Sequence, residues 1–402
     1  MLIERDTNHI GGHWYPAALA LTHAARRQGR PVVLIALNGI DEHARAELRR
    51  AGAQLTIKPA ASALEARALH LLARIGTRVS ARLRRFARHR RFPHQITLLS
   101  RCAAEAAALR IAAELPGAVP VLLTASEGLP GLAALLGGPH VRITHDVVTT
   151  QDRPLRLLDR LTRRGWDRLV VVCPTSGVRE GVACEHPGIP TVVRSFALTV
   201  PGERITVAER ATARDCWGIA ETQKVITLVG GWWPYKDVAT IDAALGRLTG
   251  HPVVLVAGTP LDEALLWRWR VLLGARLRVV HHALTERQLR TAYAATDLLL
   301  VARRPGTVTE SGLVCDAARH GIPLVVSDHD KRLCRQLGDQ RWLRVFTAGD
   351  PASLVRVLDD ALACPPARPG ADAVSLLGLS SPQDAVLAYA ECFRALPGIG
   401  AR

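Results

Sequence analysis

The sequence predicts an α/β protein built from two halves, each with a parallel sheet covered by helices. Short apolar runs rich in β-branched residues, typical of strands buried on both faces, alternate with segments of helical spacing. The alternation pauses at Val200-Pro201-Gly202-Glu203, which has the composition of a linker, and then restarts. A chain of 402 residues also exceeds one typical domain. We therefore expect domains at residues 1–200 and 201–380, followed by a terminal helix in residues 381–402.

The first half opens with a predicted βαβ unit. A short strand at Met1–Glu4 leads into a loop containing Gly11-Gly12-His13, and a helix, Tyr15–Arg27, and a strand, Pro31–Leu37, follow. The loop after the first strand of an open α/β sheet faces the ligand cleft, and glycines let the backbone approach a ligand closely. Gly11, Gly12 and His13 are therefore candidate ligand-binding residues, with a plain tight loop as the alternative.

Another candidate follows a later strand of the first half. The further strands predicted there are Val119–Thr124, Val141–His145, Arg168–Cys173 and part of Pro187–Val193. One of them ends in His145-Asp146, and α/β sheets place their sites at the carboxyl ends of strands. His145 is therefore a candidate catalytic residue, whereas Asp146 could equally cap a helix or form a turn.

Leu71–Phe92 is predicted to be an arginine-rich amphipathic helix. Apolar residues recur at helical spacing, and eight arginines fill much of the remainder. Residues 1–200 hold 28 basic against 15 acidic residues, so most of the net charge of +16 lies in the first half. Such a helix can lie on an anionic membrane or hold a polyanionic acceptor. The alternative is a surface helix whose apolar stripe packs on its own domain, with arginines supplied by a high-GC, bacterial coding bias.

The most informative stretch, Lys224–Asp237, opens the second half. A β-branched run is followed by Gly230-Gly231, then by Lys236 and a helical segment, Val238–Leu248. The free N–H groups and the dipole of a helix N-terminus attract phosphate, and a lysine adds a point charge. The pattern predicts an anion site made by Gly230, Gly231 and Lys236, with an ordinary strand-to-helix turn and a solvated lysine as the alternative.

Later in the second half, an acidic loop precedes another helix. The strands predicted in this half are Val225–Val229, Val253–Ala257, Leu277–Val280, Leu298–Ala302 and Leu324–Ser327, and a last helix is predicted at Pro382–Leu396. Between the last two strands lies Glu310-Ser311-Gly312-Leu313-Val314-Cys315-Asp316, followed by Gly321-Ile322-Pro323.

These features resemble the GT-B fold, nucleotide-sugar-dependent glycosyltransferases of the large retaining family numbered four. In that family the second domain opens with a strand, Gly-Arg and then Lys, and a loop with two glutamates later precedes a Gly-x-Pro. Gly230 and Lys236 match the first pattern, and residues 310–323 resemble the second. The resemblance covers most of residues 200–400 and is weak before that. It implies two Rossmann-like domains facing each other across a cleft, one for the acceptor and one for the nucleotide sugar, with the C-terminal helix crossing back.

The resemblance also implies roles for individual residues. Lys236 would contact the diphosphate, and Asp316 would accept hydrogen bonds from the ribose hydroxyls. Glu310 would lie in the catalytic loop over the sugar, and His145 would lie near the reacting sugar. The residues that would line the donor loop and its helix are Ser311, Gly312 and Leu313. A sugar would move to an acceptor hydroxyl with retention, without a metal or cofactor and without a protein nucleophile, because the leaving phosphate helps to deprotonate the acceptor.

Two departures from the family pattern concern the donor site. Gly231 stands where the family has arginine, which removes a phosphate cation unless Arg303 or Arg304 replaces it. The second acidic residue is Asp316, one methylene shorter than glutamate, and the register from it places the first glutamate at Val308 instead of Glu310. The donor nucleotide, the sugar and the acceptor, whether a small molecule, a glycan or a lipid-linked molecule, are left open.

The sequence leaves two alternatives to this function. A GT-B sugar-nucleotide epimerase, or an inverting transferase with His13 or Asp146 as base, is the enzymatic alternative. A basic protein that binds nucleic acid or a membrane is the other, although no helix-turn-helix or zinc pattern supports nucleic acid as a partner. Asp328-His329-Asp330 matches an Asp-x-Asp metal motif but is interpreted as a loop, and no metal is expected.

Cysteine usage and the absence of apolar runs predict the compartment. The eight cysteines have no CxxC or zinc spacing and are predicted to be reduced core thiols. The sequence has no signal-peptide pattern and no apolar run of membrane-spanning length. We expect a cytoplasmic protein, with attachment to the inner face of the membrane through the arginine-rich helix as a further expectation.

Overall fold

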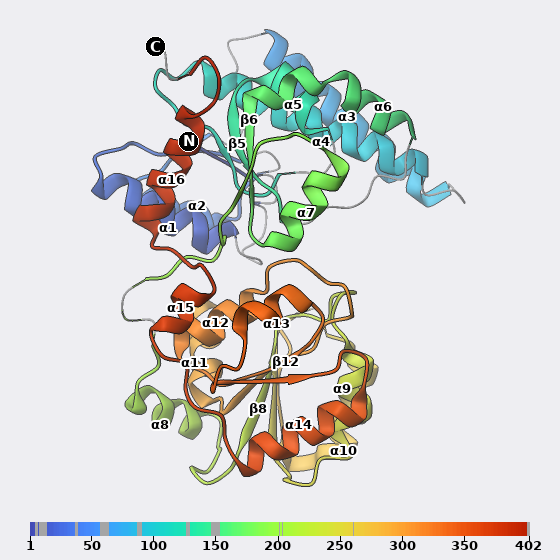
Figure 1. The fold of residues 1–402 in the computed structure, drawn as a ribbon, viewed down its shortest axis with the longest axis vertical. Helices are drawn as coiled ribbons and strands as arrows, with labels where there is room; N and C mark the ends of the chain where they lie inside the picture. Colours follow the sequence, from blue (N-terminus) through green and yellow to red (C-terminus); the bar gives the residue numbers. More distant parts are fainter. Residues whose placement is uncertain are drawn as a thin grey trace. The chain divides into compact units, whose positions relative to one another are not determined.

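The computed structural model describes residues 1–4, 7, 14–36, 39–56, 64–86, 91–125, 129–145, 153–200, 202, 204–259 and 261–399. The chain divides into two compact units (Figure 1). Unit 1 comprises Met1–Leu198 together with Ser380–Arg402, and unit 2 comprises Thr199–Leu379. The sequence had predicted changes of domain after residues 200 and 380.

Unit 1 is built on a parallel sheet of seven strands in the order β3-β2-β1-β4-β5-β6-β7. The strands are β1 Leu2–Glu4, β2 Val33–Ala36, β3 Gln54–Thr56, β4 Val121–Leu122, β5 His140–Ile143, β6 Leu169–Cys173 and β7 Thr191–Val193. The helices are α1 Trp14–Arg27, α2 Glu42–Arg50, α3 Leu64–Phe86, α4 Arg91–Ala113, α5 Pro130–Gly137, α6 Arg153–Leu161, η1 Arg163–Arg168, α7 Ser176–Glu185 and α16 Pro382–Arg394. Strands β1, β5 and β6 are buried along their whole length, as expected for parallel strands covered on both faces.

The last helix of the chain belongs to unit 1, where α16 lies beside α1 (Figure 1). Ala385 and Tyr389 of α16 are buried in the same apolar core as α1 and β5. The Gln28 side chain at the end of α1 donates to the carbonyl of Gln383 over 3.3 Å. Residues from the two ends of the chain therefore share one core, and α16 is an integral part of unit 1.

The predicted arginine-rich helix at Leu71–Phe92 is two elements, because α3 ends at Phe86 and α4 begins at Arg91. The two helices pack along each other (Figure 1). A Cβ at Gly76 of α3 would lie 2.1 Å from the Ser100 hydroxyl of α4, so the backbones approach closely. The apolar residues at helical spacing all lie within α3, and the arginines that follow Phe86 extended the prediction beyond the end of this helix.

Small residues of α3 face α4, and large apolar residues face outward. Ala73 and Ser80 are buried, and the Ser80 hydroxyl lies 2.6 Å from the Thr97 hydroxyl. Among the described side chains of α3, the large apolar ones that are exposed are Leu71, Leu72, Ile75 and Val79. The members of the predicted apolar stripe whose side chains are described, Leu72, Ile75 and Val79, are therefore exposed and not packed on α4, which contacts the small-residue face instead.

Unit 2 is built on a parallel sheet of six strands in the order β10-β9-β8-β11-β12-β13. The strands are β8 Val225–Val229, β9 Val253–Ala257, β10 Leu277–Val280, β11 Leu298–Val301, β12 Leu324–Ser327 and β13 Leu343–Phe346. The helices are α8 Val207–Cys216, α9 Val238–Leu245, α10 Glu263–Leu273, η2 Gly274–Arg276, α11 Glu286–Ala295, α12 Gly312–His320, α13 Lys331–Leu337, α14 Pro351–Ala363 and α15 Asp372–Leu376. This strand order is that of a Rossmann sheet, and it reverses between β8 and β11.

Two further features bear on the sequence predictions. All eight cysteines are free thiols, but Cys184, Cys216 and Cys364 are exposed, so the prediction of core thiols is wrong for these three. Within the described ranges, no helix combines the length and the apolar character needed to cross a membrane.

Candidate functional site

The two segments that the sequence singled out in the second half meet at the carboxyl edge of the unit 2 sheet. Gly230, Gly231 and Lys236 follow β8, and the stretch from Arg303 to Asp316 follows β11. The two strands are neighbours, and the strand order reverses between them. Open α/β sheets bind ligands at this topological switch point.

Two glycines shape the turn after β8. Gly230 has a φ of 79°, in the left-handed region, and its N–H donates to the carbonyl of Ala257 over 2.7 Å. A Cβ at Gly258, after β9, would lie 2.7 Å from the Gly230 Cα. The backbone can fold back over the sheet edge here only because neither residue has a side chain.

Lys236 points back into this turn. Its N–H donates to the Trp233 carbonyl over 2.9 Å, and its Nζ donates to the Val229 carbonyl over 2.7 Å. Burial, helped by the charge of Arg303, lowers the Lys236 pKa to about 8. The ammonium group carries three donors, so two remain for a ligand once Val229 has taken one. The alternative of a solvated lysine does not fit a half-buried side chain held in this way.

The helix N-terminus beside Lys236 already has an anionic partner. Asp237 caps α9 by accepting from the Thr240 N–H over 3.2 Å and the Thr240 hydroxyl over 2.6 Å. The same carboxylate accepts from the Gly349 N–H over 3.1 Å. The Asp237 carboxylate thus occupies the N-terminus of α9, where the sequence predicted a phosphate. The positive charge that remains for a phosphate in this turn is mainly that of Lys236.

The segment after β11 pairs with the segment after β8. Lys236 and Arg303 form an antiparallel bridge. The Arg304 N–H donates to the Tyr235 carbonyl over 2.9 Å, and the Asp237 N–H donates to the Ala302 carbonyl over 3.1 Å. The structure therefore brings the predicted lysine and arginines together, although Lys236 and Arg303 are 67 positions apart in the sequence.

Arg303 and Arg304 differ in what they do. The Arg303 guanidinium is buried and donates to the carbonyls of Thr309, over 2.8 Å, and Glu310, over 3.3 Å. It also lies over the Tyr235 ring, 5.1 Å from the centroid. Arg303 thus holds the loop that leads to α12, whereas the Arg304 side chain is exposed to solvent.

Helix α12 carries the remaining predicted residues. Ser311 caps the helix by accepting from the Val314 N–H over 3.4 Å. Ser311 and Gly312 are buried, and Leu313 packs against the core. Glu310 is half-buried in the loop before the cap, where its charge acts on Arg303. The N-terminus of α12 thus lies at the sheet edge, next to the loop that Arg303 holds.

The carboxylate of Asp316 has partners on both oxygens. Its Oδ2 accepts from the Tyr293 hydroxyl over 2.5 Å, and Arg319 donates to its Oδ1. Burial and the Asp316 charge raise the pKa of Tyr293 well above its usual range, so Tyr293 stays a donor. A ribose would share Asp316 with these two residues, since a carboxylate can accept more than two hydrogen bonds. Tyr293 and Arg319 were not among the predicted site residues.

The two aspartates of the Asp328-His329-Asp330 sequence serve the backbone. Asp328 accepts from the Ala348 N–H over 2.7 Å, and Asp330 caps α13. Burial lowers the His329 pKa to about 4, and its Nδ1 lies 3.0 Å from the Ser327 hydroxyl. Over the part of the chain that the structure describes, His, Cys, Asp and Glu side chains form no group of three suited to a metal ion.

His145, in unit 1, follows β5 at the carboxyl edge of that sheet. Its Nε2 lies 3.0 Å from the Leu123 carbonyl, so this nitrogen carries the proton. The imidazole also makes an edge contact with the Phe196 ring, with 4.5 Å between centroids. Gly11, Gly12 and His13, and Asp146, lie outside the described residues.

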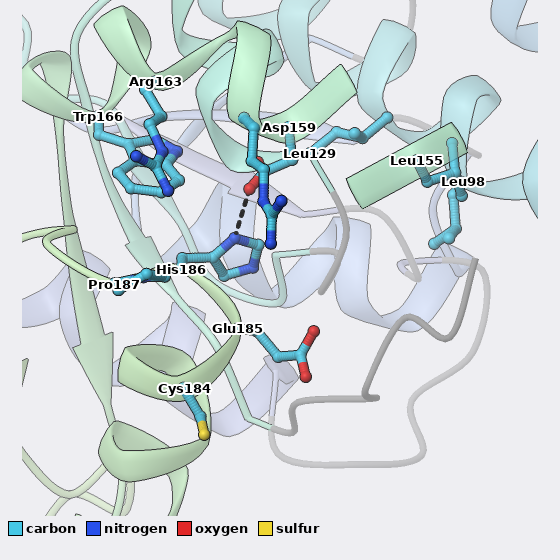
Figure 2. A pocket seen from close by; sticks show the side chains of 11 residues that line it. Leu98, Leu129, Leu155, Asp159, Arg163, Trp166, Cys184, Glu185, His186 and Pro187 are labelled. Carbon is cyan, nitrogen blue, oxygen red and sulfur yellow. Dashed lines mark hydrogen bonds and ion pairs between the residues drawn. The ribbon is translucent and has the colours of Figure 1, made fainter. Parts of the chain in front are cut away.

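A cavity of about 130 Å³ lies elsewhere in unit 1 (Figure 2). Its lining comes from α4, α6, η1, α7 and the loops beside them. Asp159 and His186 form a hydrogen-bond contact of 2.8 Å on its wall, and the Arg163 guanidinium lies 5.2 Å from the centroid of the Trp166 ring. Trp166 and His186 precede β6 and β7, so the cavity borders the amino ends of these strands and not the edge that carries His145.

Comparison with known proteins identifies the fold. No protein-family model and no curated protein matches the chain. Among solved structures, the chain is similar to a glycosyltransferase from Rickettsia africae, with 10% identity and a TM-score of 0.60 over 99% of this chain and 94% of that one. It is also similar to Alr3699/HepE from Anabaena, solved with UDP and glucose, with 12% identity and a TM-score of 0.62 over 97% of both chains.

A third similar structure is WaaG, a glycosyltransferase involved in lipopolysaccharide biosynthesis. It shares 16% identity and a TM-score of 0.54 over 100% of this chain and 96% of that one. These matches span both units, and the two parallel sheets have the element order of two Rossmann-like units. The predicted GT-B fold is therefore confirmed, and the chain has the fold of these glycosyltransferases.

Proposed function

We propose that the protein is a glycosyltransferase that moves a sugar from a nucleoside diphosphate sugar to an acceptor hydroxyl, with retention and without a metal. The observation that carries the proposal is Lys236, a partly desolvated ammonium group held by a glycine turn at the switch point of a Rossmann sheet. The fold shared with glycosyltransferases supports the same assignment, as does the pairing of Lys236 with the Arg303 segment.

Lys236 would act mainly on the leaving group. During transfer, the bond between the anomeric carbon and the phosphate oxygen breaks, and a bond from that carbon to the acceptor oxygen forms. The acceptor proton goes to an oxygen of the leaving phosphate. Negative charge builds on the diphosphate as the first bond breaks, so a fixed cation stabilises the transition state more than the ground state.

Other predicted residues would place the donor. Asp316, held by Tyr293 and Arg319, would accept from the ribose hydroxyls. Glu310 would lie over the sugar, in the loop that Arg303 holds. The role of His145 stays a prediction.

Nucleotide binding tests this proposal. Calorimetry with UDP, GDP, ADP and TDP should find micromolar binding of one nucleotide to the wild-type chain, with large losses in Lys236→Ala and Asp316→Ala. Lys224→Ala is a matched control, because Lys224 is an exposed lysine at the opposite end of β8. If none of the four nucleotides binds the wild-type chain, or if Lys224→Ala loses binding as much as Lys236→Ala, the proposal is wrong.

We also propose that α3 attaches unit 1 to an anionic membrane, which would place a lipid-linked acceptor within reach. Leu71, Leu72, Ile75 and Val79 form an exposed apolar stripe. The flanking arginines, at positions 74, 78 and 82, are exposed at spacings of four residues, so they form a basic stripe along the same helix. An apolar stripe beside a basic one suits the interface of a membrane that carries negative lipids, such as the inner face of a bacterial membrane.

Vesicle sedimentation tests the attachment. The wild-type chain should bind vesicles with 30% phosphatidylglycerol, roughly a physiological anionic content, more tightly than neutral phosphatidylcholine vesicles. Arg74→Gln with Arg78→Gln should remove that preference. A matched control pair, Arg49→Gln with Arg50→Gln, changes exposed arginines of α2 and should bind as the wild type does. Equal binding to both vesicle types by the wild-type chain would contradict the proposal.

A further inference from the structure

The turn between Gly231 and Lys236 contains three aromatic residues with different environments. The Trp232 ring packs against Trp269 in the core of unit 2, with 5.2 Å between centroids. Trp233 and Tyr235, by contrast, are 47% and 39% exposed. The chain has only eight tryptophans and four tyrosines, and Trp267 of α10 is the one other exposed member among the described side chains. Two of these three exposed rings therefore lie within one turn of the proposed phosphate cation.

The backbone of both residues, and the ring of Tyr235, are held in place before any ligand arrives. The Trp233 carbonyl accepts from the Lys236 N–H, which closes a tight turn around Pro234. The Tyr235 carbonyl accepts from the Arg304 N–H, and the Arg303 guanidinium lies against the Tyr235 ring. A rigid aromatic surface loses little conformational entropy on binding, which is the condition under which exposed rings add affinity.

We infer that Trp233 and Tyr235 form a stacking surface for the ring of the transferred sugar, an inference that rests on the proposed function. A pyranose has an apolar C–H face, which gains by leaving water for an aromatic ring, and a polar rim of hydroxyls that stays hydrated. The surface would favour sugars whose C–H face is flat and free of axial hydroxyls, so the two aromatic residues determine donor specificity.

The covalent structure of the donor favours the sugar over its other parts. The sugar is bonded directly to the diphosphate, whereas the nucleobase is separated from it by the whole ribose. The ribose itself is joined to the diphosphate through C5′, but its puckered five-membered ring lacks the flat C–H face of a pyranose. A ring that contacts residues within one turn of Lys236 is therefore the one attached to the phosphate that Lys236 binds. The acceptor is not bonded to the diphosphate, so the phosphate does not hold it beside this turn.

The test compares each nucleotide with its sugar conjugate. Calorimetry would measure the Kd of the nucleoside diphosphate that binds the wild-type chain, and the Kd of its glucose and galactose conjugates, for wild type, Trp233→Ala and Tyr235→Ala. Each variant should weaken binding of the glucose conjugate about tenfold and leave the free nucleotide unchanged. Trp233→Phe and Tyr235→Phe should retain most of the affinity. Trp267→Ala removes an exposed ring elsewhere in unit 2 and should behave as wild type.

Other outcomes overturn the inference and point elsewhere. If the variants weaken the free nucleotide and its glucose conjugate equally, but leave binding of inorganic pyrophosphate unchanged, the rings stack on the nucleobase. If no Kd changes and only the KM for an acceptor rises, they contact the acceptor. In both cases the proposed function survives, whereas failure of the wild-type chain to bind any nucleotide removes it.

Discussion

Nucleotide binding should weaken about tenfold between pH 7 and pH 9, because the phosphate cation itself loses its proton in this range. Burial and Arg303 lower the Lys236 pKa to about 8 in the free protein, from an ordinary value of 10.5. A bound diphosphate places negative charge beside the ammonium and raises its pKa again. A group whose pKa rises on binding takes up protons, so affinity is full below pH 8 and is lost as the pH rises above it.

The magnitude follows from the size of the shift. If the bound pKa returns to 10.5, affinity falls about tenfold for each pH unit between 8 and 10.5, and the loss between pH 7 and pH 9 is about one power of ten. At pH 8, where half of the free protein is protonated, binding should take up about half a proton. The terminal phosphate of a nucleoside diphosphate is already dianionic in this range, because its pKa is about 6.

Calorimetry at pH 8 in two buffers with different ionisation enthalpies measures the proton uptake directly. The matched control is Lys236→Arg, because arginine stays charged throughout, so its affinity should be nearly constant from pH 7 to pH 9. A wild-type Kd that is constant over this range refutes the assignment of Lys236 as a phosphate ligand. A pH dependence that is equal in wild type and Lys236→Arg would show that another group titrates.

Three further predictions concern the same edge of the sheet. Gly258→Ala should abolish nucleotide binding and lower the free energy of unfolding by about 2–4 kcal/mol, because the Cβ of alanine would overlap the Gly230 backbone. Calorimetry measures the loss of binding, and urea unfolding measures the loss of stability. Asp237→Ala should cost about 1–2 kcal/mol in urea unfolding through loss of the α9 cap. Asp237→Asn should cost less, because asparagine keeps the bond from the Thr240 N–H and loses the one from the Gly349 N–H. Arg304→Ala should weaken nucleotide binding without changing the Tm. Arg303→Ala should weaken binding and also lower the Tm, because Arg303 holds the loop before α12. Equal Tm values for the two variants would contradict this role of Arg303.

The sequence was most informative where strands are buried on both faces. Runs such as Val225–Val229 and Val253–Ala257 were predicted with their observed bounds, because a strand covered by helices on both sides must be apolar throughout. The strands β3 and β13 were not predicted. Both lie at sheet edges and contain polar residues, Gln54 and Arg344 among them, so they lack a continuous apolar run.

The candidate site was predicted in part. A parallel sheet brings the carboxyl ends of neighbouring strands together, so the meeting of Lys236 with the Arg303 segment could be expected from topology. Which arginine is exposed depends on side-chain conformation, and spacing carries no information about it. The contact of Tyr293 with Asp316 also joins two helices, α11 and α12, through a single hydroxyl group. Sequence patterns register apolar periodicity but not such individual polar contacts.

Gly231, at the position where the family that the sequence resembles has arginine, leaves the turn with few positive charges. Arg303, the nearest alternative, is buried and uses both terminal nitrogens of its guanidinium to hold the loop carbonyls. Asp237 adds a negative charge at the helix N-terminus. The turn therefore has a single inward-facing ammonium group, and the proximity of Arg303 makes that group easier to deprotonate. An arginine at position 231 would place a second guanidinium, besides that of Arg303, near Lys236 and would lower the Lys236 pKa further. Glycine at this position therefore favours a charged Lys236 at neutral pH, while Arg303 holds the loop.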